Sequence, residues 1–113
     1  MAEPRTTFHL APRRHWEIWD PTAPYESPSL AEEGFIHCTD GIANMVATAN
    51  RFYRSDPAEF VVLTVNLDEC GSAWRIDDPG KPFPHIYGPI ARAAVVAVRP
   101  FPRDQDGLFT AFE

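Results

Sequence analysis

The segment EGFIHCTD, residues 33–40, places an imidazole beside a thiol where a short apolar stretch ends. Cys38 could act as a nucleophile, with a histidine as its general base. No glycine-flanked nucleophile turn surrounds this cysteine, and free cysteines are commonly buried. The pattern therefore favours a packing role for Cys38.

His37 has two interpretations. A buried strand histidine needs a hydrogen-bond partner, because an unpaired polar group in apolar surroundings costs about 1–3 kcal/mol, and a neighbouring strand's backbone could supply that partner. However, His37 lies one residue from the predicted strand end, and Thr39 or Asp40 can cap a helix there. Strand ends and helix N-termini offer free amides and a favourable dipole to ligands, above all to anions. The position of His37 therefore favours a ligand site with Thr39 without excluding a core histidine that bonds a neighbouring strand.

The segment KPFPHIYGPI, residues 81–90, is the second place where chemistry could occur. Its prolines keep it extended, which suits a stiff edge strand. It also suits a pocket wall, in which aromatic rings stack on a ligand while His85 and Tyr87 orient it. Both interpretations stay open at this point.

The other histidines are His9, on a predicted strand, and His15, which we expect at a helix edge on the surface. The chain has no HxH, HxxxH or CxxC spacing, so we predict no metal site. The aromatic group Trp16, Trp19 and Tyr25 favours a core cluster over a stacking platform.

Hydrophobic periodicity predicts the elements that must position these residues. The clearest signal runs from Ile42 to Tyr53, where apolar residues recur at the spacing of an amphipathic helix. Shorter helices are predicted at 13–18 and 28–33, the second ended by Gly34 in a left-handed cap. Strands are predicted at 6–10, 34–38, 60–67, 73–76, 83–87 and 93–98. This order, with helices early and strands late, indicates an α+β domain.

Length and composition narrow the function. The 113 residues predict a single domain with a core at about 6–98 and a C-terminal surface arm at 99–113. The net charge of −6 argues against nonspecific nucleic acid binding. No apolar run approaches the ~18–20 residues that cross a bilayer, and the first residues lack a signal-peptide core, so we expect a cytoplasmic protein with no membrane contact. We expect a monomer or weak dimer.

Four motifs together carry a resemblance: EGFIHCTD, TANRFY at 48–53, the strand VVLTVNLD, and FPHIYGPI. They resemble the family known as domain of unknown function 952, from Phe8 to about Val98. Members often have Ser where Thr39 stands, which keeps the hydroxyl. The family is similar to a compact ADP-ribosyltransferase-like fold, a split β-sheet domain that holds NAD in a cleft.

The resemblance implies roles for particular residues. His9 would hold the NAD ribose from the first strand, and residues 34–39 look like the second, histidine-hydroxyl strand, similar to that of RNA 2′-phosphotransferases. That superfamily usually has a late-strand glutamate, and no Glu lies in 83–90 or 93–98. His85 or Tyr87 are the residues that could take its place. Arg51 and Arg92 could contact phosphate.

Together these observations predict a cleft lined by histidines that binds or acts on NAD, ADP-ribose or a related phosphorylated nucleotide. The predicted catalytic residues are His37 and His85. The predicted ligand-binding residues are His9, His37, Thr39, Arg51, His85 and Tyr87. NAD would be a substrate, and an enzyme of this kind would be an ADP-ribosyl transferase, phosphotransferase or hydrolase. A non-catalytic module for small anions and a Cys–His hydrolase are the alternatives.

Overall fold

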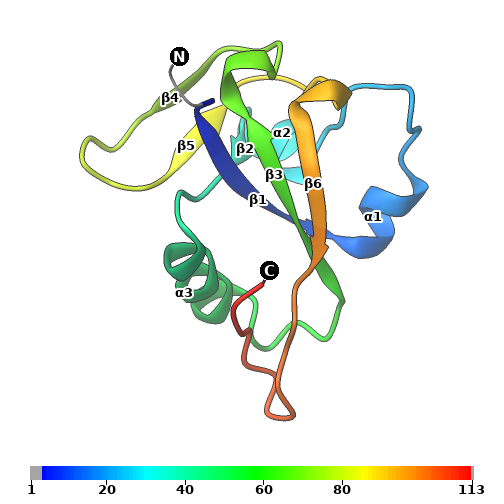
Figure 1. Ribbon diagram of the computed structural model, residues 1–113, viewed down its shortest axis with the longest axis vertical. Coiled ribbons are helices and arrows are strands. Elements are labelled where there is room, and N and C mark those ends of the chain that lie inside the picture. Colours follow the sequence, from blue (N-terminus) through cyan, green and yellow to red (C-terminus); the bar gives the residue numbers. More distant parts are fainter. Residues whose placement is uncertain (1–3, 113) are drawn as a thin grey trace.

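The computed structural model describes residues 4–112, which form an α+β domain with the predicted order of strands and helices (Figure 1). The first half contains β1 (Thr6–Pro12), α1 (Arg13–Ile18), α2 (Pro28–Glu33), β2 (Ile36–His37) and α3 (Ile42–Phe52). The second half contains β3 (Phe60–Asn66), η1 (Leu67–Glu69), β4 (Trp74–Ile76), β5 (Pro84–Ile86), η2 (Arg92–Ala94) and β6 (Val95–Pro100).

The strands form two separate three-stranded antiparallel sheets, in the orders β1-β3-β6 and β2-β5-β4. An isolated bridge connects them, in which Phe8 and Thr39 exchange backbone hydrogen bonds of 3.1 and 2.8 Å. The second sheet is short, since β2 pairs with β5 through only two residue pairs. Thr39 of the predicted site therefore lies where the two sheets meet.

Strand β3 is central because both of its faces are covered, as its nearly continuous apolar sequence predicts. Val61, Leu63 and Val65 pack in a cluster that also receives side chains from the second sheet and the segment after α1. Phe60 and Val62 pack on the opposite face in a second cluster. These two clusters are called the first core and the second core below.

Helix α3 forms as its periodicity predicts, but its N-terminus differs from the prediction. The N-cap is Gly41, with a positive φ of 86°, and no side chain caps the helix. Capping by Thr39 or Asp40 is therefore wrong, because the Thr39 backbone pairs with Phe8 and the Asp40 carboxylate binds Arg5. The helix buries Met45 and Ala49 in the second core.

The prediction of a surface arm after residue 98 is also wrong. Strand β6 extends to Pro100, and Phe101, Phe109 and Phe112 are buried in the second core. Asn50 of α3 binds this segment twice, donating to the Phe109 carbonyl at 3.0 Å and accepting from its amide at 2.7 Å. Figure 1 shows the segment running beyond β6 and back toward α3. Its aromatic residues supply apolar surface that α3 needs.

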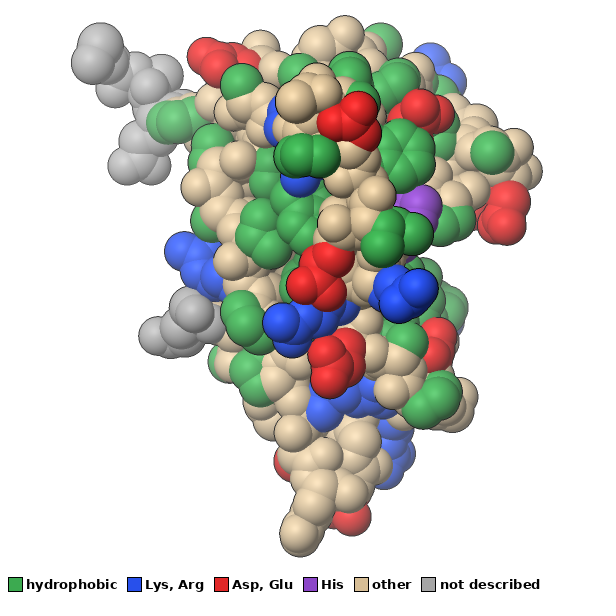
Figure 2. Space-filling model, turned by 90° about the vertical axis from the view of Figure 1, so that its right-hand side faces the viewer, with side chains coloured by type: hydrophobic (Ala, Val, Ile, Leu, Met, Phe, Trp, Pro, Cys, Tyr) green, Lys and Arg blue, Asp and Glu red, His purple; other side chains and the backbone are tan. Residues whose placement is uncertain are grey.

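Strand β6 is an edge strand, and its Val96 and Val98 side chains are exposed. Figure 2 shows the side of the molecule on which α1 lies, where hydrophobic side chains are interspersed with acidic and basic ones. No helix within residues 4–112 is long and apolar enough to cross a membrane.

Replacing the last buried aromatic residue tests the role of the C-terminal segment. We expect Phe112→Ala to lower the free energy of unfolding by about 3 kcal/mol, because it leaves a cavity in the second core. Chemical denaturation monitored by circular dichroism measures this loss. Gln105→Ala, at an exposed turn position, is the control and should change stability by less than about 0.5 kcal/mol. Equal stability of the two variants would show that the segment is a dispensable arm.

Candidate functional site

A cavity of about 720 Å³ lies where β1, β5, the end of β2, α2 and α3 meet. Three of the four histidines line it, namely His9, His37 and His85. Its acidic side chains are Glu32, Glu33, Asp56 and Asp78. Its larger apolar side chains are Leu10, Met45, Phe52, Tyr53, Phe60 and Phe83. A space of this size, partly apolar and with convergent polar groups, has the character of a small-molecule site.

His9 is buried, with 4% of its surface exposed, and its ring joins the two sheets. Its Nδ1 donates to the carbonyl oxygen of His37 at 2.7 Å, which fixes the proton on Nδ1 because a carbonyl only accepts. Burial lowers the pKa of His9 to about 4, so the ring is neutral at pH 7. Its Nε2 is then an acceptor, and no donor binds it among the described residues.

His37 lies at the end of β2, and half of its side chain is exposed. Its Nε2 bonds the Glu33 carboxylate at 2.8 Å. Gly34 makes this contact possible, because its left-handed conformation, with φ of 87°, ends α2 and turns the chain into β2 within two residues. The carboxylate holds the ring so that Nδ1 remains for a ligand.

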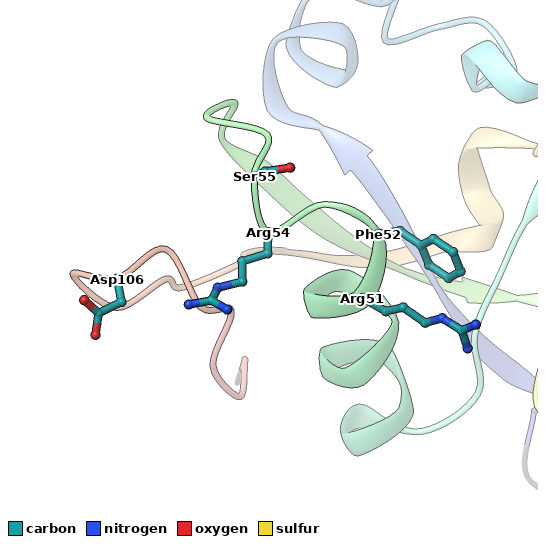
Figure 3. A pocket seen from close by; sticks show the side chains of 5 residues that line it. All are labelled: Arg51, Phe52, Arg54, Ser55 and Asp106. Carbon is teal, nitrogen blue, oxygen red and sulfur yellow. The ribbon is translucent and has the colours of Figure 1, made fainter.

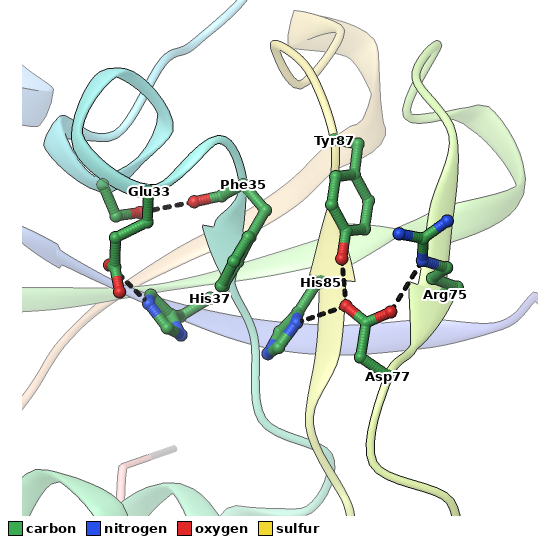
Figure 4. Close-up of polar contacts among 8 residues, drawn as sticks. Glu33, Phe35, His37, Arg75, Asp77, His85 and Tyr87 are labelled. Atoms are coloured by element: carbon green, nitrogen blue, oxygen red, sulfur yellow. Dashed lines mark hydrogen bonds and ion pairs between the residues drawn. The ribbon is translucent and has the colours of Figure 1, made fainter.

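His85, on β5, is held by a second carboxylate from the loop after β4 (Figure 4). Its Nδ1 bonds Asp77 at 2.8 Å, and the same Asp77 oxygen accepts from the Tyr87 hydroxyl. Arg75 donates to the other oxygen at 2.6 Å and lies over the Tyr87 ring. The bonds from Tyr87 and then His85 lower the pKa of Asp77 to about 2, so it is ionised at neutral pH.

Phe35 connects the two histidines. Its ring stacks on His85 with centroids 4.1 Å apart and meets the edge of His37 at 4.8 Å, so the two imidazoles lie 5.4 Å apart. Figure 4 shows the rings of His37 and His85 below Phe35, the first toward Glu33 and the second toward Asp77. Two carboxylate-held imidazoles that adjoin one cavity are arranged for general acid–base chemistry.

Of the six predicted ligand-binding residues, the cavity wall contains His9, His37, Thr39 and His85. Tyr87 is not at the wall and instead supports Asp77. Arg51 borders a separate shallow hollow with Phe52, Arg54, Ser55 and Asp106. Figure 3 shows Arg54 extending toward the turn that carries Asp106, whereas Arg51 extends to the other side, beside Phe52.

Arg92 is also remote from the cavity, because it lies over the Trp16 ring at 3.9 Å and donates to the Asp20 carbonyl. The first turn of α3 does not line the cavity either; the helix contributes Met45, Thr48 and its C-terminal end. The helix N-terminus and the two arginines that the sequence suggested for binding an anion are therefore not at the wall.

Cys38 touches the cavity wall but is 98% buried, with 2% of its surface exposed. Burial raises the pKa of its thiol well above the usual range, which keeps the sulfur protonated and weakly nucleophilic. Within residues 4–112, no group of three or more His, Cys, Asp or Glu side chains is placed to hold a metal ion.

Sequence reasoning missed the two carboxylates that hold the histidines. Glu33 opens the same segment as His37, four residues before it, but the contact depends on the glycine turn between them. Asp77 lies in an exposed loop with no periodic signal, and only the pairing of β4 with β5 brings it beside His85. A search for acidic residues within four positions of each histidine would have included Glu33, but not Asp77, which lies eight residues from His85.

The fold and the cavity define a small α+β domain of two antiparallel sheets, with a histidine-lined cavity where they meet. The chain belongs to the family described as "Protein of unknown function (DUF952)", whose model matches residues 10–98. This match confirms the family that the four sequence motifs predicted.

The chain is also similar to solved structures of protein CC0527 from Caulobacter crescentus. The crystal structure is 25% identical over 94% of each chain, with a TM-score of 0.75, and a double mutant of that protein gives the same values. The solution NMR structure is 25% identical over 91% of this chain and 90% of that one, with a TM-score of 0.68. No curated protein matches the chain.

The pKa of His9 predicts a pH dependence of stability. The folded pKa of about 4 is below the unfolded value of 6.5, so stability is fully present above pH 6.5 and is lost as the pH falls toward 4. We expect protonation of His9 to lower the free energy of unfolding by roughly 3 kcal/mol when the pH falls from 7 to 4. Urea denaturation of the wild type and His9→Gln at both pH values measures the difference, because glutamine donates to the His37 carbonyl without titrating. Parallel losses in the two proteins would contradict the assignment.

Proposed function

We propose that the cavity is an enzyme site that binds the ribosyl part of a nucleotide of the NAD or ADP-ribose class and hydrolyses or transfers the group at its C1′ carbon. The observation that carries this proposal is the pair of carboxylate-held imidazoles, His37 and His85, 5.4 Å apart at the wall of the cavity. The ADP-ribosyltransferase-like fold that the family resembles is part of the same proposal.

His37 is the proposed general base. Its Nε2 is bonded to Glu33, so Nδ1 is the atom that receives a proton. In the hydrolysis of an N-ribosyl bond, the water oxygen bonds to C1′ while the C1′–N bond breaks, and its electron pair leaves with the nitrogen. One proton of the water passes to His37 Nδ1 and then to solvent. Glu33 orients the ring, as a carboxylate does in other histidine-based catalytic groups.

Glu33 also supplies the carboxylate that the late strands lack. Positive charge develops on the ribose in the transition state of such a reaction, and a fixed negative charge nearby stabilises it. The site has this charge on α2 instead of on β5 or β6. His85, fixed by Asp77 through Nδ1, leaves Nε2 to bind a ribose hydroxyl or the leaving group.

Binding without turnover is the second candidate. It is favoured by the exposure of the His37 and Glu33 side chains, 52% and 49%, because water weakens the electrostatic help that a carboxylate gives to a developing cation. A Cys–His hydrolase has less support, because the Cys38 thiol is buried and protonated.

The experiment combines binding with product analysis. NAD, ADP-ribose and a 2′-phosphorylated nucleotide are titrated into the protein by NMR, and the mixtures are then analysed by chromatography for free nicotinamide, ribose or phosphate. We expect shifts in residues of the cavity wall and turnover of at least one compound. Binding with no product would favour the binding module, whereas no shift at millimolar ligand would contradict both candidates.

Substitution of the histidines tests the mechanism. We expect His37→Gln and His85→Gln each to lower turnover by about 100-fold or more, since general acid–base groups contribute on this scale. His15→Gln is the matched control, because His15 binds the Glu26 carbonyl outside the cavity. If the three variants keep equal activity, the acid–base assignment is wrong.

A further inference from the structure

The charges around the cavity restrict the chemistry of its ligand. Among the described side chains that line it, none is a lysine or arginine, whereas Glu32, Glu33, Asp56 and Asp78 are acidic. Phosphate-binding sites in proteins rely on arginine, lysine or free backbone amides at a helix N-terminus. The wall has no such side chain. The residues of α3 that line it are Met45, Thr48 and Phe52, and only the last of these lies at the C-terminal end, where the helix dipole is negative.

Three arginines near the cavity are already engaged by other partners, and Arg51 lies over the Phe52 ring, 5.1 Å from its centroid, at the neighbouring hollow. Arg75 bonds Asp77 and lies over Tyr87. Arg5 forms a two-bond pair with Asp40, at 3.0 and 2.8 Å. Arg103 donates to carbonyls of the loop after α3. None of these side chains lines the cavity, and moving one there would leave its present partner without its bonds.

His9 gives the second, independent observation. It is 96% buried, with 4% of its surface exposed, and its Nδ1 hydrogen is already donated to His37. Because the ring is neutral, its Nε2 is an acceptor, and no partner satisfies it within residues 4–112. Although this atom is itself buried, a ligand hydroxyl or amine that reaches it from the cavity would satisfy it, whereas a phosphate oxygen would be repelled by it. This histidine therefore selects a donor.

The apolar part of the wall adds a feature that suits a cation. Phe52, Tyr53 and Phe83 line the cavity together with the acidic residues. Aromatic faces attract organic cations, and the attraction grows when water is displaced from the site. Acidic and aromatic groups around one cavity thus favour a flat or alkylated cation over a simple metal ion.

We propose that the cavity takes the cationic, hydroxyl-bearing end of its ligand, such as an N-ribosyl pyridinium group, and excludes phosphate groups from its interior. This inference rests on the proposed function for the ribosyl class of ligand, and it adds that the bound end of the ligand is positively charged. The phosphates of a dinucleotide would remain outside the acidic wall, so a nucleoside should bind better than its nucleotide.

Four compounds separate the contributions of charge and phosphate. Nicotinamide riboside is a cationic nucleoside without phosphate, and benzamide riboside is its neutral counterpart of the same shape. ADP-ribose has the ribosyl group with a pyrophosphate, and inorganic pyrophosphate has the anion alone. Isothermal titration at two salt concentrations should show nicotinamide riboside binding at least tenfold more tightly than the other three, with an affinity that falls as salt rises.

Variants of the wall provide the matched test on the protein. We expect Glu32→Gln and Asp78→Asn each to weaken nicotinamide riboside about threefold and to leave benzamide riboside unchanged, as for partly exposed charge pairs. Glu69→Gln removes the same charge from η1, away from the cavity, and should change neither affinity. A circular dichroism spectrum of each variant confirms that it is folded.

The outcomes distinguish this inference from the proposed function. Tighter binding of ADP-ribose or pyrophosphate, equal binding of the two ribosides, or no binding of any compound would overturn the inference. Preferential binding of the cation without any cleavage supports the inference and counts against the enzyme. Cleavage of a tightly bound ADP-ribose would leave the enzyme proposal intact and remove the charge preference.

Discussion

The hydrogen bond from His9 to the carbonyl oxygen of His37 is the contact on which the arrangement of the cavity depends. It joins the first sheet to the second, beside the bridge between Phe8 and Thr39. The bond uses the backbone of His37, so the imidazole of that residue remains free to meet Glu33 on the surface. His37 therefore contributes to the contact between the two sheets through its main chain, and its side chain lines the cavity. The neutral state of His9 follows from the same burial that makes the bond strong.

Periodicity predicted much of the fold. Helix 42–52 and the buried strand at 60–66 carry patterns that depend only on local geometry, and both were confirmed. The failures came from long-range contacts. Proline-rich residues after 98 read as a surface arm because nothing local indicates that Phe101, Phe109 and Phe112 share one core with α3. The prediction that Thr39 caps α3 was wrong because the backbone of Thr39 forms the bridge between the sheets.

The candidate site was predictable only where local sequence identified its residues, and not where long-range contacts assemble it. His37 and His85 were predicted as site residues from the motifs that surround them, at 33–40 and 81–90. The pairing of β2 with β5 places them directly opposite each other. Asp77 could not be found, because its role depends on the path of a loop. The negative charge of the cavity wall could not be predicted either, because its four acidic residues come from segments as far apart as Glu32 and Asp78. Overall charge indicated an acidic protein, but it could not indicate an acidic pocket.

Arg103 has an effect on how this protein is made. It donates to the carbonyls of Arg54, Asp56 and Ala58, and so fixes the loop that contributes Asp56 to the cavity wall. These partners precede it by 45 to 49 residues. During synthesis from the N-terminus, this loop has no such anchor until the segment that carries Arg103, 45 to 49 residues further along, has left the ribosome. The cavity wall is thus not fully anchored when most of its residues have been translated, because the anchor of the loop at Asp56 follows 47 residues later.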